Sequence, residues 1–231
     1  MNPTGAAPRP DDDRQTAADE VFDSLHRDIR SLRLTPGTRL SEADVARRLA
    51  VSRQPVREAF IRLGDMNLLQ IRPQRATVVR RIAEADMQQA RFVRTAVEIE
   101  VAQRACTAFT PGHEAEFRRN LARQARAVAD DDPDGFHALD YEFHQLLCDT
   151  AGCPFVSRTI AATKLHVDRV CMISLNDRGA MATLLQDHEG IVACLGCGDR
   201  EGIVALVRLH LSRLDHVIAT ARQKHPEYFE D

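Results

Sequence analysis

Four ionisable side chains interrupt faces of predicted helices that are otherwise apolar. Asp140 and His144 stand four residues apart, so both project from one face of a helix rich in Phe and Leu. His188 and His210 each fall in the same way among Leu, Ile and Val at helical spacing. Because an unpaired buried charge is very costly, the simplest arrangement is that these four side chains satisfy one another.

The last two of these four side chains, His188 and His210, are placed symmetrically about a turn. His188 and His210 are centred on position 199, and Gly196–Asp199 is a turn signal. An antiparallel helical hairpin would therefore bring both histidines to the same level of a bundle. Together with Asp140 and His144, they indicate a site for a divalent transition metal, with Zn as the first expectation and Ni or Mn also open. The alternative is separate core histidines, each bonded to a backbone carbonyl.

Arg94 lies beside the apolar stripe of an earlier predicted helix, where it could bind an anionic ligand. A guanidinium group grips a carboxylate through two parallel hydrogen bonds. A divalent metal with three neutral imidazoles and one carboxylate keeps positive charge, and Arg94 adds to it. That surplus favours a small carboxylate effector, either dianionic or hydroxylated. The alternative is a surface ion pair between Arg94 and Glu98, four residues further on.

A single CxxC pattern, Cys194 and Cys197, is also present. It could bind metal or cycle between thiol and disulfide. The plainer interpretation is that two small residues stand at the end of a helix.

The composition of the 231 residues, 44% hydrophobic and 28% charged, is that of a globular protein and excludes disordered or collagen-like chains. No apolar run is long enough to span a bilayer, and the N-terminus lacks the apolar segment of a secretory signal. We therefore expect a cytoplasmic protein without a membrane partner, whose six Cys are reduced thiols.

The charge is divided unevenly along the chain. Residues 14–81 hold 14 Arg, no Lys and 8 acidic residues, which gives a net charge of +6. Residues 82–231 hold 16 Lys and Arg against 23 acidic residues, which gives a net charge of −7. A basic segment followed by an acidic one indicates two domains with different partners, and the basic one could meet phosphates.

The basic segment has the element order of a winged helix-turn-helix. After a polar tail at 1–15, we expect a helix from Thr16 to the Pro36–Gly37 turn, a helix begun by Ser41, and a third helix, begun by Ser52, over 53–63. Both serines can cap their helices. Asn67 tolerates the left-handed conformation that ends the third helix. Two strands, 68–72 and 76–80, then form the wing.

Six amphipathic helices and no strands are predicted for the acidic segment. The predicted helices cover 84–107, 111–129, a third centred on Phe136–Leu147, 155–175, 181–195 and 200–222. Such a pattern is typical of an antiparallel helical bundle. The chain is thus expected to be mainly α, with a winged-helix domain at 16–81, an all-α bundle at 82–224 and a C-terminal tail at 225–231.

Particular motifs in the basic segment resemble the DNA-binding domain of GntR-family transcriptional regulators. The resemblance rests on three stretches of sequence: LTPGTRLSE at 34–42, LAVSRQPVREAF at 49–60 and IRPQRATVV at 71–79. Asn67 and Ala76 stand where family members usually carry Gly. The resemblance implies that the helix over 53–63 reads DNA bases.

The bundle is similar to the FCD ligand-binding domain of the FadR-type branch of the same family. The similarity rests on Arg94-x-x-Val-Glu98, Asp140-x-x-x-His144, His188 and His210, which occur in that order. It implies that the four clustered residues hold Zn or a similar ion and that small carboxylate effectors bind at the ion. It also implies that Arg94 contacts the effector.

Candidate DNA contacts follow from the winged-helix motif. Arg53, Gln54 and Arg57 begin the recognition helix, where Arg reads guanine and Gln reads adenine. Phosphate or minor-groove contacts are expected from three further residues: Arg39, Gln74 and Arg75.

These features together predict a transcription factor rather than an enzyme. One recognition helix makes few base contacts, so we expect a homodimer on a short palindromic operator in double-stranded DNA. The carboxylate would change operator affinity by favouring one arrangement of the bundle. The family resemblance implies a repressor that its effector releases from DNA. Two alternatives stay open: a metal-dependent enzyme with an attached DNA-binding domain, and a regulator whose metal is purely structural.

Overall fold

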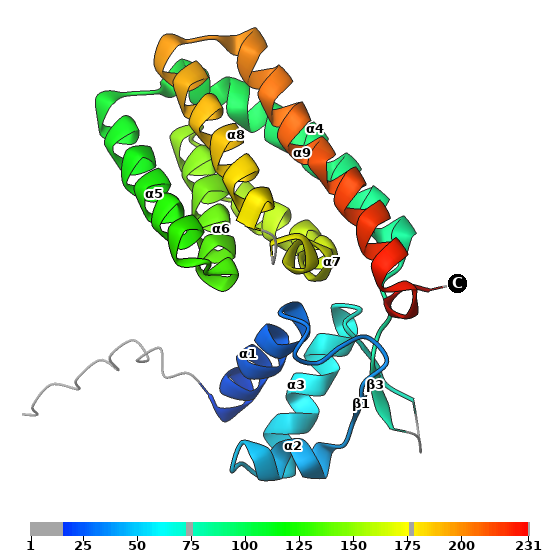
Figure 1. The fold of residues 1–231 in the computed structure, drawn as a ribbon. Coiled ribbons are helices and arrows are strands. Elements are labelled where there is room, and N and C mark those ends of the chain that lie inside the picture. The colour runs from blue at the N-terminus through cyan, green and yellow to red at the C-terminus, as the bar shows by residue number, and fades with distance from the viewer. Residues whose placement is uncertain (1–15, 73–75, 176–177, 231) are drawn as a thin grey trace, which may run out of the picture. The chain divides into compact units, whose positions relative to one another are not determined.

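The computed structural model describes residues 16–72, 76–175 and 178–230 (Figure 1). These residues fall into two compact units. One contains the described residues up to Asp28 together with Thr38–Arg80, and the other contains Ile29–Gly37 and the chain from Arg81 onward. No helix in the described ranges is long and apolar enough to cross a membrane.

Three helices make up most of the N-terminal unit: α1 (Ala17–Arg30), α2 (Glu42–Arg48) and α3 (Arg53–Asp65). Helix α1 begins with a reciprocal cap, since the Asp19 amide donates to the Thr16 hydroxyl and the Thr16 amide donates to the Asp19 carboxylate, each at 3.1 Å. Val56 and Leu63 of α3 are fully buried, which fixes the face of α3 that remains exposed.

A three-stranded antiparallel sheet completes the unit. Its strands are β1 (Arg39–Leu40), β2 (Leu69–Gln70) and β3 (Thr77–Val79), in the order β1-β3-β2. The two wing strands are shorter than the sequence predicts, and β1 was not foreseen because two residues carry no periodicity. Arg39 pairs with Val78, so β1 adds a third strand to the wing, antiparallel to β3.

The turns of the N-terminal unit confirm one local prediction and correct another. Asn67, two residues after the end of α3, adopts the left-handed conformation with φ 57°. Ser41 and Ser52 stand at the N-cap positions of α2 and α3, but neither hydroxyl accepts a cap hydrogen bond. In α2 the acidic residues of the first turn, Glu42 and Asp44, favour the positive end of the helix instead.

Six helices form the second unit, and none of the sequence-predicted helix ends is misplaced by more than a few residues. They are α4 (Glu84–Ala108), α5 (Pro111–Asp130), α6 (Pro133–Thr150), α7 (Val156–Leu175), α8 (Arg178–Cys197) and α9 (Arg200–Lys224). Thr110, Asp132 and Asp199 cap α5, α6 and α9 through their side-chain oxygens. The mainly α fold expected from the sequence is confirmed.

Helices α8 and α9 form the antiparallel hairpin that the spacing of the histidines predicted (Figure 1). Gly198, at φ 72°, makes the turn possible, and the Asp199 carboxylate accepts a hydrogen bond from the Gly202 amide at 2.9 Å. His188 and His210 consequently face each other, with ring centroids 4.8 Å apart.

The residues after α9, expected from the sequence as a C-terminal tail, fold back onto the bundle. They contain the 3₁₀ turn η1 (Pro226–Tyr228) and a parallel bridge between Phe229 and Ile82. The Phe229 side chain is 2% exposed and packs in a core cluster with Met87 and Ile218. This segment therefore ties Phe229 to Ile82, two residues before α4 begins.

Candidate DNA-binding surface and metal centre

The N-terminal end of α3 is an exposed polar surface. Arg53, Gln54 and Arg57 are all exposed there, as expected for residues that reach base edges. Gln54 donates a hydrogen bond to Glu58 at 3.0 Å along the same helix. The side chains that the sequence singled out as base contacts are thus available to DNA.

Arg57 is held in place by a residue that the sequence reading missed. Its guanidinium donates to both carboxylate oxygens of Glu42 in α2, at 3.3 and 3.1 Å. Hydrogen bonding to Glu42 raises the pKa of Arg57 above its usual value. Two hydrogen bonds to one carboxylate fix the orientation of the Arg57 guanidinium group. The spacing of 15 residues gave no signal for this pair.

Of the remaining expected DNA contacts, the structure describes Arg39 alone. Arg39 is exposed on β1 and borders a surface hollow shared with Arg72 and Gln70. Gln74 and Arg75, expected at the tip of the wing, lie outside the described residues.

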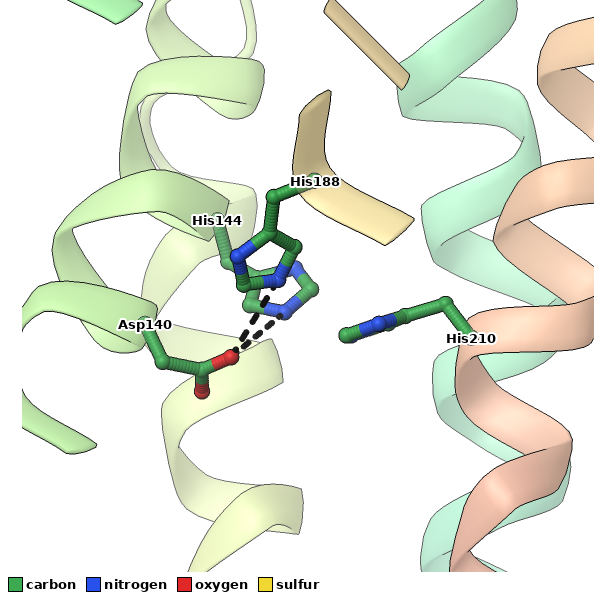
Figure 2. Close-up of side chains that lie close together, drawn as sticks. All are labelled: Asp140, His144, His188 and His210. Atoms are coloured by element: carbon green, nitrogen blue, oxygen red, sulfur yellow. Dashed lines mark ion pairs between the residues drawn. The ribbon is translucent and has the colours of Figure 1, made fainter. Parts of the chain in front are cut away.

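The four predicted metal ligands meet in the core of the bundle (Figure 2). Asp140 and His144 come from α6, His188 from α8 and His210 from α9. One ligand atom from each lies within 4.8 Å of those from the other three, and all four residues are buried. Among the residues that the structure describes, this is the only such group of His, Cys, Asp or Glu.

A chain of hydrogen bonds determines which nitrogen of His188 carries the proton. The Leu139 carbonyl accepts from the Asn120 amide group at 3.1 Å, and Gln124 then donates to the Asn120 oxygen at 2.6 Å. The remaining oxygen of Gln124 lies 2.8 Å from Nδ1 of His188, so Nδ1 must donate. The Nε2 atom is left with a lone pair.

That lone pair faces another acceptor. Nε2 of His188 is buried without a hydrogen-bond partner and lies 3.4 Å from Oδ1 of Asp140. Burial lowers the pKa of His188 well below its usual value, which disfavours a second proton. Two acceptors that face each other in a dry core repel, unless a cation lies between them.

His144 has a related arrangement, except that its Nε2 atom has a hydrogen-bond neighbour in Arg94. Its Nδ1 lies 2.7 Å from Oε2 of the buried Glu98, which directs its Nε2 to the cluster, 3.7 Å from Oδ1 of Asp140. Although burial alone would raise the pKa of Glu98, Arg94 and His144 hold it well below its usual value. Glu98 is therefore a carboxylate that orients His144 through the nitrogen opposite the cluster.

The third imidazole is oriented by Asp187. Nδ1 of His210 lies 3.5 Å from Oδ2 of Asp187, whose other oxygen accepts a hydrogen bond from Arg213 at 2.7 Å. Burial lowers the pKa of His210 to about 4. Each of the three histidines thus has an oxygen on its Nδ1 side, which is the usual pattern for imidazoles that bind metal through Nε2.

Two buried residues of α7 were missed by sequence reasoning. Lys164 pairs with Oδ2 of Asp140, and its ammonium lies 4.0 Å from the centroid of the Tyr141 ring. Asp168 accepts hydrogen bonds from His137 at 3.0 Å and from the Tyr141 hydroxyl at 2.8 Å. A signal existed: positions 164 and 168 interrupt the apolar face of α7 just as the histidines interrupt theirs.

Arg94 is buried beside the cluster. Its Nε donates to Glu98 at 2.6 Å, so the i, i+4 pair considered from the sequence does form, but in the core instead of on the surface. A second nitrogen of Arg94 lies 3.5 Å from Nε2 of His144. Arg94 also lines a small cavity together with Asp140 and His210.

The CxxC residues stand at the C-terminal end of α8. Cys194 is half-buried, Cys197 is exposed, and burial raises the pKa of the Cys194 thiol. The negative end of a helix disfavours a thiolate, so this position lacks the activation of a redox-active CxxC.

A winged helix that exposes arginines at its recognition helix, in one chain with a helical bundle that encloses an ionisable cluster, defines a two-domain DNA-binding transcription regulator. Comparison with known proteins gives the family. Residues 17–79 match the bacterial regulatory proteins of the gntR family, and residues 89–213 match the FCD domain. The chain therefore belongs to the GntR family of transcriptional regulators and carries an FCD domain.

Individual relatives agree with this assignment. The chain is 36% identical to the HTH-type transcriptional repressor RspR of Escherichia coli (strain K12) over 94% of its own length and 95% of that protein. Among solved structures, it resembles E. coli McbR/YncC with a TM-score of 0.75 and 20% identity, covering 91% of this chain and 99% of that one. A GntR regulator from Rhodococcus sp. RHA1 gives a TM-score of 0.73 and 22% identity, over 87% and 97%. These two structures support the fold.

Proposed function

We propose that this regulator controls DNA binding through a metal-bound small carboxylate in its FCD domain. The observation that carries the proposal is the convergence of unprotonated imidazole nitrogens on a buried carboxylate. His188 and His144 both direct Nε2 to the same oxygen of Asp140, at 3.4 and 3.7 Å. A divalent cation between these atoms would turn mutual repulsion into coordination.

The donor set favours one class of ion. Three imidazole nitrogens and one carboxylate oxygen suit Zn, with Ni and Mn as alternatives, and all four donors come from Asp140, His144, His188 and His210. When bound, such an ion would supply a Lewis-acidic position for an oxygen of the effector. Because the donors come from α6, α8 and α9, occupancy of the site would link three helices of the bundle.

Arg94 is proposed as an effector contact. It lines the cavity beside the cluster. Glu98 engages its Nε, and one terminal nitrogen lies 3.5 Å from Nε2 of His144, so the other terminal nitrogen is the one offered to a ligand. The presence of a cavity at the cluster favours an effector site over a metal that is purely structural.

The N-terminal unit is proposed to bind as part of a homodimer. Arg53, Gln54 and Arg57 would read bases in one half of a palindromic operator. Phosphate and minor-groove contacts would come from Arg39 and from the wing residues, Gln74 and Arg75. We propose action as a repressor in the cytoplasm, by similarity to RspR, with operator affinity altered by the effector.

The test measures operator affinity of the full chain by fluorescence anisotropy, on a palindromic site obtained by selection from random DNA. Zn-loaded protein and chelator-treated protein are each titrated with a panel of carboxylates. The proposal expects a carboxylate to change operator affinity of the loaded protein only. Equal responses with and without metal, or responses only to uncharged or cationic compounds, would contradict it.

A further inference from the structure

The charged groups around the cavity beside the cluster limit the net charge of a ligand that binds there. This inference rests on the proposed function. The cavity has a volume of about 70 Å³. Its charged lining residues are Arg94, Asp140, Lys164 and Arg213, while His137 and His210 add imidazole edges.

Every cation that lines the cavity already has a carboxylate partner. Arg94 pairs with Glu98, Lys164 pairs with Asp140, and Arg213 pairs with Asp187. These three pairs leave no surplus positive charge. The sequence-based prediction of a strongly cationic pocket counts only the metal, its four ligands and Arg94. It overestimates the positive charge of the pocket, because the carboxylate partners of these cations are not evident from the sequence.

One further carboxylate shifts the balance. Asp168 accepts a hydrogen bond at 3.0 Å from His137, which lines the cavity. The charged residues that line the cavity or pair with a lining residue thus comprise three cations and four anions, a net charge of −1. A divalent ion in the cluster would bring this net charge to +1, which one negative charge neutralises and two do not.

Apart from Cys171 and Ser174, the rest of the lining is apolar. The apolar side chains are Phe136, Leu175, Leu184, Leu211, Leu214 and Val217. Phe136 is fully buried, and Leu184, Ser174, Arg213 and Val217 also border a larger groove of about 600 Å³ between α7, α8 and α9. A ligand whose charged end lies at the cluster would therefore extend past hydrocarbon toward that groove.

We propose that the effector is a monocarboxylic acid with an apolar body, instead of a dicarboxylic or polyhydroxylated acid. Its carboxylate would lie between the cluster and Arg94, and its hydrocarbon part would pack against Phe136 and Leu184 on the way to the groove. A second carboxylate or a row of hydroxyl groups would lose its hydration against these residues without gaining partners.

The test compares three acids of equal carbon number: hexanoate, adipate and gluconate. Binding to the Zn-loaded full chain is measured by isothermal titration calorimetry at pH 7. We expect hexanoate to bind at least about tenfold tighter than either of the others, and tighter than acetate or butanoate, since one uncompensated charge or a few lost apolar contacts correspond to about that factor. If adipate or gluconate binds best, the inference is overturned while the carboxylate site of the proposed function stands.

Two variants probe the two halves of the argument separately. Asp168→Asn removes one negative charge at constant shape, outside the metal ligands, and should narrow the preference for hexanoate over adipate about tenfold. Leu184→Asn should reduce the gain in affinity from acetate to hexanoate, while acetate itself binds unchanged. Leu206→Asn is the matched control, because Leu206 is half-buried on α9 but does not line the cavity.

The outcomes separate the inference from the proposed function. If Zn binds but no carboxylate does, the effector part of the proposed function fails, and the inference fails with it. If hexanoate binds best but neither variant changes the ranking, the charge balance and the apolar lining are not its cause, and the inference fails alone. If Asp168→Asn does not fold, Leu184→Asn still decides the apolar half, and the comparison of the three acids decides the charge.

Discussion

Replacing Gln124 by Leu should weaken metal binding although Gln124 is not itself a ligand. Its oxygen accepts the Nδ1 proton of His188 at 2.8 Å, and this contact leaves Nε2 unprotonated toward the cluster. Without it, His188 can take the other tautomer and rotate. Gln124→Glu keeps an acceptor at the same position and should retain most of the affinity.

The expected size follows from the role of the contact. Loss of a partner that orients a metal-bound imidazole costs about 10–100-fold in metal affinity, which corresponds to about 1.4–2.7 kcal/mol. Because the folded state alone binds the ion, the same amount disappears from the metal-dependent part of the stability. In a domain of this size that amounts to about 3–10 °C in Tm. The metal-free protein also loses stability, since Asn120 and His188 are left with unsatisfied polar atoms.

The assay therefore measures two quantities for each variant: the Zn dissociation constant by competition with a chromogenic chelator, and the difference in Tm between loaded and metal-free protein. Gln223→Leu, a change of the same kind at an exposed position of α9, is the control and should alter neither. The reasoning is refuted if Gln124→Leu binds Zn as tightly as the wild type, or if Gln124→Glu loses as much affinity as Gln124→Leu.

Three further outcomes are expected from other parts of the molecule. Arg57→Ala should remove sequence preference in gel-shift titrations at fixed salt, at a cost of about 1–3 kcal/mol per half-site, whereas Arg39→Ala should weaken binding to all sequences alike and flatten its salt dependence. The folded-state pKa of His210 is about 4, below the unfolded value of about 6.5, so the unfolded chain binds more protons as the pH falls. The free energy of unfolding of the metal-free protein, measured in urea, should therefore be lower by about 3 kcal/mol at pH 4 than at pH 6.5. In His210→Gln this decrease should be smaller. Phe229→Ala should lower the free energy of unfolding by about 3–5 kcal/mol, because it leaves a cavity next to Ile82; an unchanged Tm would show that the C-terminal segment does not stabilise the bundle.

The positions of the four clustered residues could be predicted because each breaks a strong helical period. Asp140 and His144 share a face by their spacing, and the symmetry of His188 and His210 about a turn depends only on helix geometry. Lys164 interrupts the apolar face of α7 in the same way, but its partner Asp140 is brought to it only by the packing of α6 on α7. Ion pairs between helices, such as Asp187 with Arg213, cannot be predicted from helical spacing, because only the packing of α8 on α9 brings the two residues together.

In the N-terminal unit, local sequence patterns predict the helices but not the contacts between elements. The helices follow from apolar spacing and from the Asn67 and Pro36–Gly37 signals, which depend on local backbone energetics. The strand β1 is only two residues long, and its existence depends on hydrogen bonds to β3, which no local pattern encodes. The pairing of Arg57 with Glu42 likewise requires the tertiary contact between α2 and α3.

The central claim, that the four converging side chains hold a metal, is tested most directly by elemental analysis of the purified full chain. About one divalent ion per chain is expected in the wild type and in His216→Ala, whereas His188→Ala should retain well below one. A wild type that binds no ion after dialysis against Zn, or a His188→Ala variant that retains as much as His216→Ala, would contradict the claim.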